Sequence, residues 1–185
     1  MVQTLSTMLP LGTKAPHFEL WDACSNTTLS LGQIKSNRAT VIMFLCNHCP
    51  YVKHIQTKLI EIAKKYQAKH ISFVAINSNN VETYPADSPE CMQQEALIHG
   101  YTFPYLYDES QTVAKAYHAA CTPDFYIFDQ ALLCVYRGRF DDSTLGNGKP
   151  ATGKDICTAL DALLDHQPIP DAQFPSLGCN IKWRR

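Results

Sequence analysis

Residues 39–50 read Ala-Thr-Val-Ile-Met-Phe-Leu-Cys-Asn-His-Cys-Pro, an apolar run that ends in a C-x-x-C motif and a proline. The uninterrupted apolar segment Ala39–Leu45 predicts a fully buried central strand. Apolar residues then recur at steps of three and four, which predicts a helix from about Pro50 to Ala68. Because Ile71–Ile76 has the pattern of a second buried strand, this part of the chain predicts a β-α-β unit with a parallel, right-handed crossover.

The rest of the chain predicts further strands and helices around this unit. They are strands at Phe18–Trp21, Tyr101–Tyr107, Asp124–Asp129 and Leu132–Arg139, and helical segments at Leu29–Ile34, Glu90–His99, Ser110–His118 and about Ile156–Leu164. The predicted fold class is α/β, with a mixed central sheet flanked by helices, an N-terminal β extension and an irregular C-terminal tail. We expect one domain at residues 1–165 and a proline-containing tail at 166–185, and we expect the Asp- and Gly-rich segment 141–153 to be a solvated loop.

Composition narrows the class of protein. The chain has 185 residues, of which 45% are hydrophobic and 18% charged, and its formal net charge is −1, so it predicts one globular domain without a nucleic-acid or membrane-binding surface. Residues 1–10 contain no Lys or Arg, unlike the start of a signal peptide, so we expect a cytoplasmic protein. Because the cytosol is reducing, most of the eight cysteines are expected to be buried packing residues rather than structural disulfides.

The C-x-x-C motif is the exception, since it lies where the buried strand meets the long helix. Unsatisfied N–H groups and about half a positive charge at a helix N-terminus stabilise a thiolate there. We therefore expect Cys46 to be an exposed nucleophile of lowered pKa and Cys49 to be the resolving thiol. A protonated His48 would add positive charge beside Cys46 and tune it further. No second C-x-x-C pair is present for a structural zinc site, so we predict neither a metal nor another cofactor.

Four stretches resemble one family. They are Gly12–Leu20, Met43–Ile55 with the C-N-H-C-P motif, Cys121–Asp129 and Pro175–Trp183. Together they are similar to the thioredoxin-like superfamily, in its peroxiredoxin-related (AhpC/TSA-like) branch. The resemblance implies a thioredoxin-like fold, a cis peptide bond before Pro123, and a role for Thr122 and Pro123 in receiving a partner chain by backbone pairing.

Two departures from the family pattern bear on activity. Peroxiredoxins place a Thr three residues before the reactive cysteine and a Pro four residues before that. Counting back from Cys49 gives Cys46 and Ile42 instead, so the groups that activate peroxide are missing from these positions. Thioredoxins bury an acid in the strand before the motif, whereas residues 40–45 contain none.

Three functions follow from these residues. The preferred one is a thiol–disulfide oxidoreductase that uses Cys46 and Cys49 on protein or small-molecule disulfides and thiols, with thioredoxin or glutathione as a candidate reductant. The alternatives are a peroxiredoxin-like thiol peroxidase, and a copper-binding protein that uses Cys46 and Cys49 with Cys121 or His48.

Two more cysteines are accessory candidates. The resemblance brings Cys121 close to the motif, as a third redox thiol or as a small packing residue. Cys179 is expected in the tail, where it either folds back to resolve an adduct on Cys46 or packs beside Ile181 and Trp183.

Overall fold

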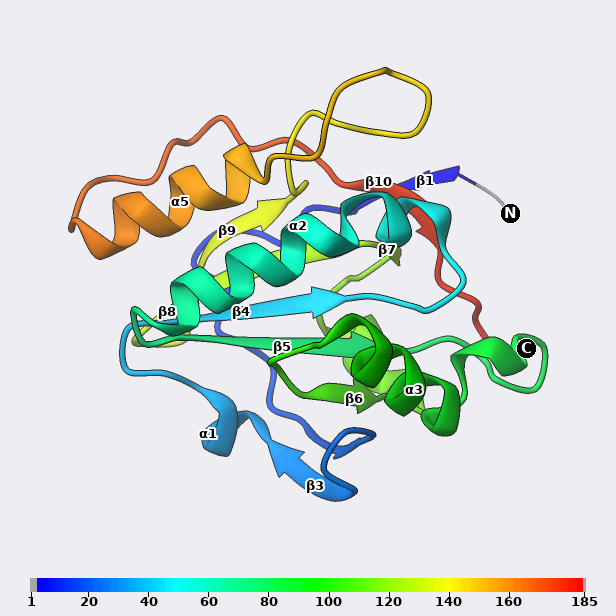
Figure 1. The fold of residues 1–185 in the computed structure, drawn as a ribbon. Helices are drawn as coiled ribbons and strands as arrows, with labels where there is room; N and C mark the ends of the chain where they lie inside the picture. The colour runs from blue at the N-terminus through cyan, green and yellow to red at the C-terminus, as the bar shows by residue number, and fades with distance from the viewer. Residues whose placement is uncertain (1–2, 185) are drawn as a thin grey trace.

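The computed structural model describes residues 3–184, so the outermost positions of the two predicted segments, residues 1, 2 and 185, lie outside it. Its main sheet has, in spatial order, β3 (Thr27–Ser30), β2 (Glu19–Asp22), β6 (Tyr105–Tyr107), β5 (Ile71–Asn77), β4 (Ala39–Phe44), β8 (Asp124–Asp129) and β9 (Cys134–Gly138). The helices are α1 (Leu31–Ile34), α2 (Pro50–Gln67), the 3-10 helix η1 (Pro85–Asp87), α3 (Pro89–His99), α4 (Thr112–Ala116) and α5 (Lys154–Leu164). The α/β class with a mixed sheet is therefore confirmed (Figure 1).

Strand β4 is the centre of the molecule. All six of its residues are buried, and it pairs in parallel with β5 and antiparallel with β8. A strand covered on both faces needs apolar side chains at every position, which explains its continuous apolar sequence. The predicted β-α-β unit of β4, α2 and β5 and the antiparallel hairpin of β8 and β9 are both present.

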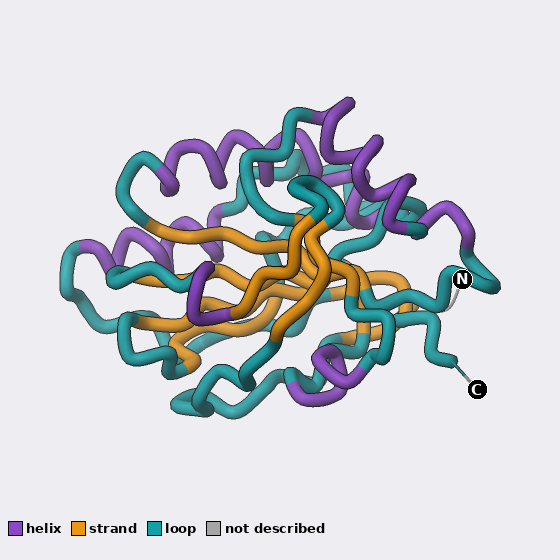
Figure 2. The backbone as a smooth tube through the Cα atoms, turned by 90° about the horizontal axis from the view of Figure 1, so that it is seen from below, coloured by secondary structure: helices purple, strands orange, loops and turns teal. Residues whose placement is uncertain are grey.

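Helices cover both faces of this sheet (Figure 2). One face packs against α2, α3 and α5, through residues such as Leu59, Met92 and Leu160. The other face packs against α1 and α4, through Leu31 and Val113. None of the helices among residues 3–184 is long and apolar enough to cross a membrane.

A second, three-stranded sheet joins the two ends of the chain. Strand β10 (Leu177–Asn180) lies between β1 (Gln3–Leu5) and β7 (Cys121–Thr122) and is antiparallel to both. The C-terminal tail therefore contains one strand and is otherwise irregular, and neither β1, β3 nor β10 was predicted. These strands have no hydrophobic alternation of their own, and the hydrogen-bonding partners of β1 and β10 lie far away in the chain.

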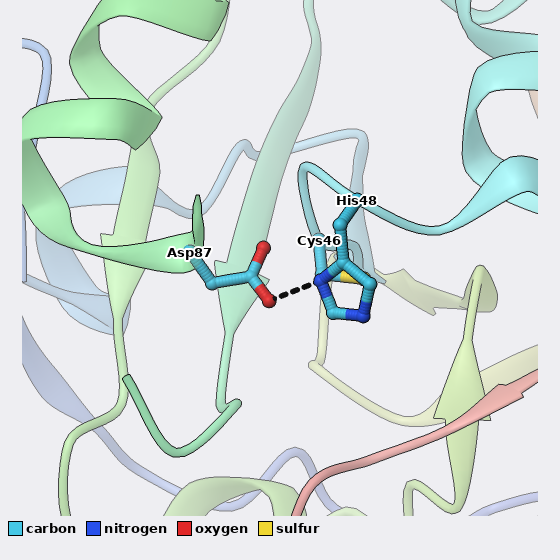
Figure 3. Close-up of side chains that lie close together, drawn as sticks. All are labelled: Cys46, His48 and Asp87. Carbon is cyan, nitrogen blue, oxygen red and sulfur yellow. Dashed lines mark hydrogen bonds and ion pairs between the residues drawn. The ribbon is translucent and has the colours of Figure 1, made fainter. Parts of the chain in front are cut away.

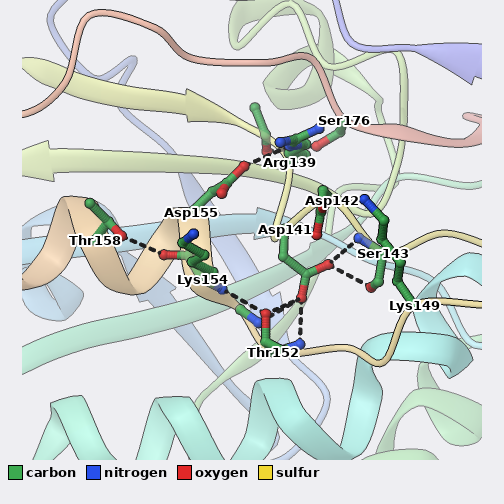
Figure 4. A network of polar contacts seen from close by, with 12 residues as sticks. Arg139, Asp141, Asp142, Ser143, Lys149, Thr152, Lys154, Asp155, Thr158 and Ser176 are labelled. Atoms are coloured by element: carbon green, nitrogen blue, oxygen red, sulfur yellow. Dashed lines mark hydrogen bonds and ion pairs between the residues drawn. The ribbon is translucent and has the colours of Figure 1, made fainter.

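The predicted solvated loop is anchored at one residue. Asp141 is buried and accepts hydrogen bonds from the backbone N–H groups of Ser143 at 2.8 Å, Thr152 at 2.6 Å and Gly153 at 2.6 Å (Figure 4). The expectation of a solvated loop is thus wrong for Asp141 but holds for 145–150, which are exposed. Because Gly153 is the N-cap of α5, this carboxylate fixes where the loop ends and the helix begins.

Candidate active site

The C-x-x-C motif connects the carboxyl end of β4 to the first turn of α2. Cys49 is the N-cap of α2 and Pro50 is its first residue. The Cys46 Sγ lies 3.1 Å from Thr122 Oγ1, and the Cys49 thiol donates to the Thr122 carbonyl oxygen at 3.1 Å. The peptide bond between Thr122 and Pro123 is cis, as the resemblance implied. The fold thus brings four predicted site residues together.

Both cysteines of the motif are buried. Cys46 is 1% exposed and Cys49 is 0% exposed, so the predicted exposed position of Cys46 is wrong. The motif does not project from the end of the sheet, because Asn47 and His48 are tied to η1 and both sulfurs face Thr122. In this state a partner can reach the sulfurs only after a local movement of the residues that cover them.

The two thiols differ in acidity in the direction opposite to the prediction. A hydrogen bond from Cys46 lowers the pKa of the Cys49 thiol to about 5 against the effect of burial, with support from Cys179 and the Val52 N–H. The pKa of Cys46 is raised well above its usual value by its hydrogen bond to Cys49, by burial and by the negative charge of Asp87. Cys49 is the residue at the helix N-cap, and the N–H of Val52 in the first turn of α2 contributes to lowering its pKa.

Asp87 is the main site residue that sequence reasoning missed. Its buried carboxylate accepts a hydrogen bond from His48 Nδ1 at 2.6 Å (Figure 3). It also accepts from the Asn47 N–H at 2.7 Å and from Asn79 Nδ2 at 2.8 Å. Burial alone would raise the pKa of this carboxyl, but the hydrogen bonds from His48, Asn79 and Asn47 outweigh it and lower that pKa. The partner Asn79 could have been identified from its place two residues after β5. The carboxyl ends of the parallel strands β4 and β5 share one edge of the sheet, so residues that follow them lie close together.

His48 is held on two sides. Its Nδ1 faces Asp87, and its ring stacks on Tyr84 with centroids 5.0 Å apart. A positive charge on His48 would lie directly against the Asp87 carboxylate, which offsets its effect on Cys46. The predicted tuning of Cys46 by His48 alone therefore has to be replaced by tuning through the His48–Asp87 pair, whose acidic member raises the pKa of Cys46.

One group of three candidate metal ligands occurs among the described residues. One ligand atom each from Cys46, His48 and Asp87 lies within 4.8 Å of the others. This set differs from the predicted copper ligands, since it contains neither Cys49 nor Cys121. A thiolate, an imidazole and a carboxylate suit zinc better than copper(I).

The two accessory thiols lie next to Thr122 in different strands. Cys121 precedes it in β7, and Cys179 lies opposite it in β10. Cys121 is buried in β7, and its Sγ faces the carbonyl oxygens of Pro123 at 3.7 Å and Ser176 at 4.0 Å. Burial, first of all, raises the pKa of its thiol far above the usual value. Cys179 is buried in β10, directly opposite Thr122, and interacts with Cys49. It needs no folding back to reach the motif, and its neighbour there is Cys49 rather than Cys46.

The backbone of Thr122 already has partners within the chain. β7 pairs with β10 through Thr122 opposite Cys179 and Cys121 opposite Asn180. The Thr122 carbonyl oxygen also accepts from the Cys49 thiol. The expectation that Thr122 presents a free backbone to an incoming chain is therefore wrong for this state, because β10 occupies that edge.

A buried acid lies on the other side of Pro123. Asp124 is 1% exposed. It accepts hydrogen bonds from the Tyr126 hydroxyl at 2.9 Å and from the N–H of the next residue, Phe125, at 3.1 Å. Burial raises the pKa of its carboxyl to about 7, although the hydrogen bonds from Tyr126, Ser176 and Phe125 oppose the shift. Strand β4 lacks a buried acid, whereas its neighbour β8 carries one opposite Phe44.

Next to Pro123 the surface is hollowed. A cavity of about 140 Å³ is lined by Pro123, by Tyr51 and Ile55 of α2, and by Arg139 and Pro175. It lies beside the motif, on the side of α2 that faces the Asp141 loop. Its walls are both apolar and charged.

These features define a class of protein. The mixed sheet, the C-x-x-C motif before α2 and the facing cis-proline are those of the thioredoxin-like fold, and a putative protein disulfide isomerase from Bacteroides thetaiotaomicron shares it with a TM-score of 0.67 at 14% identity over 88% of this chain and 94% of that one.

The family follows from a family-model match. The AhpC/TSA family model matches residues 11–136, and the chain belongs to this family of thioredoxin-like thiol–disulfide oxidoreductase or peroxiredoxin-type proteins. An uncharacterized conserved protein from Geobacillus kaustophilus is 58% identical, with a TM-score of 0.98 over 100% of this chain and 97% of that one. A hypothetical protein from Sinorhizobium meliloti is 44% identical, with a TM-score of 0.95 over 98% of both chains. Among curated proteins no match was found.

Proposed function

We propose that this protein is a thiol–disulfide oxidoreductase in which Cys46 and Cys49 alternate between a dithiol and a disulfide. The observation that carries the proposal is the pair of buried sulfurs of the C-x-x-C motif, which both contact Thr122. The lowered pKa of Cys49 favours its thiolate, which is the form that attacks disulfides.

The proposed reaction begins at Cys49 and thereby reverses the roles predicted from the sequence. The Cys49 thiolate attacks one sulfur of a partner disulfide, so that a mixed disulfide forms and the first partner thiolate leaves. Cys46 then attacks the Cys49 sulfur, a Cys46–Cys49 disulfide forms, and the second partner thiolate leaves with the proton of Cys46. The partner gains two electrons and the protein loses two.

A trapping experiment tests the assignment of roles. The variants Cys46→Ser, Cys46→Ser/Cys179→Ser and Cys49→Ser are incubated with insulin or oxidised glutathione, quenched in acid and analysed by mass spectrometry. We expect a mixed disulfide on Cys49 when Cys46 is replaced, retained most fully in Cys46→Ser/Cys179→Ser because no neighbouring thiol is left to release it, and at least a hundredfold loss of insulin reduction in Cys49→Ser. An adduct only on Cys46 in Cys49→Ser would restore the sequence-based roles, and no adduct in any variant would refute the proposal.

A thiol peroxidase is the second candidate. It is favoured by membership of the AhpC/TSA family and by the lowered pKa of Cys49, because the thiolate is also the form that peroxide oxidises. The residue three positions before Cys49 is Cys46, a thiol that can condense with a Cys49 sulfenate. Loss of hydrogen peroxide at a rate no greater than that of a free thiol would exclude this activity.

Metal binding is the third candidate. It is favoured by the group of Cys46, His48 and Asp87, but the 2.6 Å hydrogen bond between His48 and Asp87 has to break before both bind one ion. Titration of the reduced protein with zinc in competition with a chromophoric zinc-binding indicator tests it. The matched control is Asp87→Asn, which should weaken zinc binding at least tenfold if the carboxylate is a ligand.

Partners and location remain part of the proposal. We propose protein or small-molecule disulfides as substrates, thioredoxin or glutathione as the reductant, and a cytoplasmic location, where reductants of this kind are maintained. The cavity beside Pro123 is the surface that we propose for the partner, because its apolar and charged walls include the cis-proline and Tyr51, which lies two residues after Cys49.

A further inference from the structure

Strand β10 brings a third thiol, that of Cys179, to the site. The strand lies along β7 and packs against α2, beside the first turn that carries Cys49 (Figure 1). The approach of β10 to Thr122 is very close, because a Cβ added to Gly178 would lie 2.0 Å from the Thr122 carbonyl oxygen. Only glycine fits at this position. The neighbouring residue, Cys179, is thereby held opposite Thr122, the residue that both motif cysteines contact.

Cys49 therefore has a sulfur neighbour on two different elements. Cys46 at the end of β4 and Cys179 in β10 belong to the same buried cluster as Cys49, and Cys179 lies opposite Thr122, whose carbonyl oxygen faces Cys49. Both neighbours lower the pKa of Cys49. An incoming sulfur of a substrate chain would approach a Cys49 thiolate from the same positions. β10 itself occupies the edge of β7 where a partner strand would pair, so Cys179 lies where a substrate cysteine is expected.

We propose that Cys179 is a third redox thiol that competes with Cys46 for a disulfide bond to Cys49. In the oxidised protein, the Cys179 sulfur attacks the Cys49 sulfur of the Cys46–Cys49 disulfide. The Cys49–Cys179 bond forms, the Cys46–Cys49 bond breaks, and the proton that Cys179 loses is taken up by Cys46. No oxidant is consumed, and Cys46 returns to the thiol form while the chain remains oxidised.

The same chemistry gives Cys179 a role in turnover, which rests on the proposed function. A mixed disulfide on Cys49 can be released by attack of Cys179 as well as by attack of Cys46. Cys121 is a matched control for this role, since it is buried in the adjacent strand β7 but its sulfur faces the carbonyl oxygens of Pro123 and Ser176.

The experiment maps disulfides by mass spectrometry after oxidation with one equivalent of diamide, acid quenching and alkylation of the remaining thiols. We expect a Cys49–Cys179 disulfide in most molecules of Cys46→Ser, none in Cys46→Ser/Cys179→Ser, and the wild-type pattern in Cys121→Ser. Because Cys46→Ser leaves β10 intact, a failure of Cys179 variants to fold would not obscure this result. Absence of a Cys49–Cys179 disulfide in folded Cys46→Ser would overturn the proposal.

A kinetic measurement separates this inference from the proposed function. The mixed disulfide of Cys49 with glutathione is expected to disappear at least tenfold faster in Cys46→Ser than in Cys46→Ser/Cys179→Ser. Equal rates would remove Cys179 from the reaction. If the wild-type protein fails to reduce insulin while the Cys49–Cys179 disulfide still forms in Cys46→Ser, the proposed function fails and the inference stands.

Discussion

Two buried carboxylates at opposite sides of α2 make a useful comparison, Asp87 beside the C-x-x-C motif and Asp141 at the start of α5. Each accepts backbone N–H groups, and hydrogen bonds lower the pKa of each against the effect of burial. The described hydrogen-bond partners of Asp141 are backbone N–H groups and hydroxyls, so it fixes a loop. Asp87 also binds His48 and acts on the Cys46 thiol, so the same kind of acceptor influences reactivity.

The comparison teaches that the neighbours of a buried carboxylate, and not its burial, decide its role. A negative charge that accepts only N–H and O–H groups lowers the free energy of the folded chain. A negative charge that also lies close to a thiol disfavours the thiolate. In this site Asp87 adds to the hydrogen bond with Cys49 and to burial in raising the pKa of Cys46, while the pKa of Cys49 is lowered.

Replacing Asp87 with Asn should have the largest effect. The Asn amide carries no negative charge and cannot accept all three hydrogen bonds. We therefore expect a loss of about 2 to 4 kcal/mol in the free energy of unfolding at pH 7. In the Cys49→Ser background, the same change should lower the pKa of Cys46, as measured by the pH dependence of its alkylation. An unchanged pH profile of Cys46 would break the comparison, because Asp87 would then act on stability alone.

Asp124 adds a carboxyl whose pKa is shifted in the opposite direction. Its pKa is raised to about 7 in the folded chain, against roughly 3.9 when unfolded, so its contribution to stability is full below about pH 4 and is lost as the pH rises to about 7. Asp124→Asn should remove this pH dependence, which we expect to amount to about 1 to 3 kcal/mol between pH 5 and pH 8. Urea unfolding at these two pH values measures it, and an equal slope in both proteins would contradict the raised pKa.

Replacing Asp141 with Asn should have a smaller effect, confined to stability. Because its folded pKa is lowered, its contribution is present above the unfolded value of roughly 3.9 and is lost as the pH falls through the folded value. We expect the free energy of unfolding to fall by about 1 to 2 kcal/mol at pH 7 and the difference from wild type to shrink in acid. Thermal unfolding at pH 7 and pH 3 measures this. Alkylation of Cys46 and Cys49 should stay within twofold of wild type, and a larger change would couple the loop to the site.

Lys149→Ala is the smallest change. Lys149 pairs with Asp142 in the same loop, and both side chains are about half exposed. An exposed ion pair of this kind contributes little to folding. We expect no measurable change in melting temperature or in thiol reactivity, and a clear loss of stability would mean that the loop is held by more than Asp141.

Much of the fold could be predicted because it depends on local patterns. The continuous apolar run of β4, the helical period of α2 and the cap of α3 by Ser88 with Gly100 at its end are each written in a short stretch of sequence. Strands β1 and β10 could not be found in this way, because they are short and their stabilisation comes from pairing between the two ends of the chain.

The residues of the site could be predicted from the sequence, but their burial and the shifts in their pKa values could not. Spacing identified Cys46 and Cys49, and the resemblance identified Pro123 and its cis bond. The acidity of each thiol depends on which N–H groups and carboxylates lie within a few ångströms of it, and η1 brings Asp87 to Cys46 from about forty positions along the chain. No local pattern carries that information.

By itself, the sequence determined the central β-α-β unit and the position of the C-x-x-C pair between β4 and α2, since both follow from nearest neighbours along the chain. Only the tertiary structure decided that the sulfurs are buried, that the pKa of Cys49 is lowered and that Cys179 lies opposite Thr122 beside it. The physical reason is that burial and electrostatic interaction depend on distance in space, and β10 and η1 approach the motif only when the whole chain has folded.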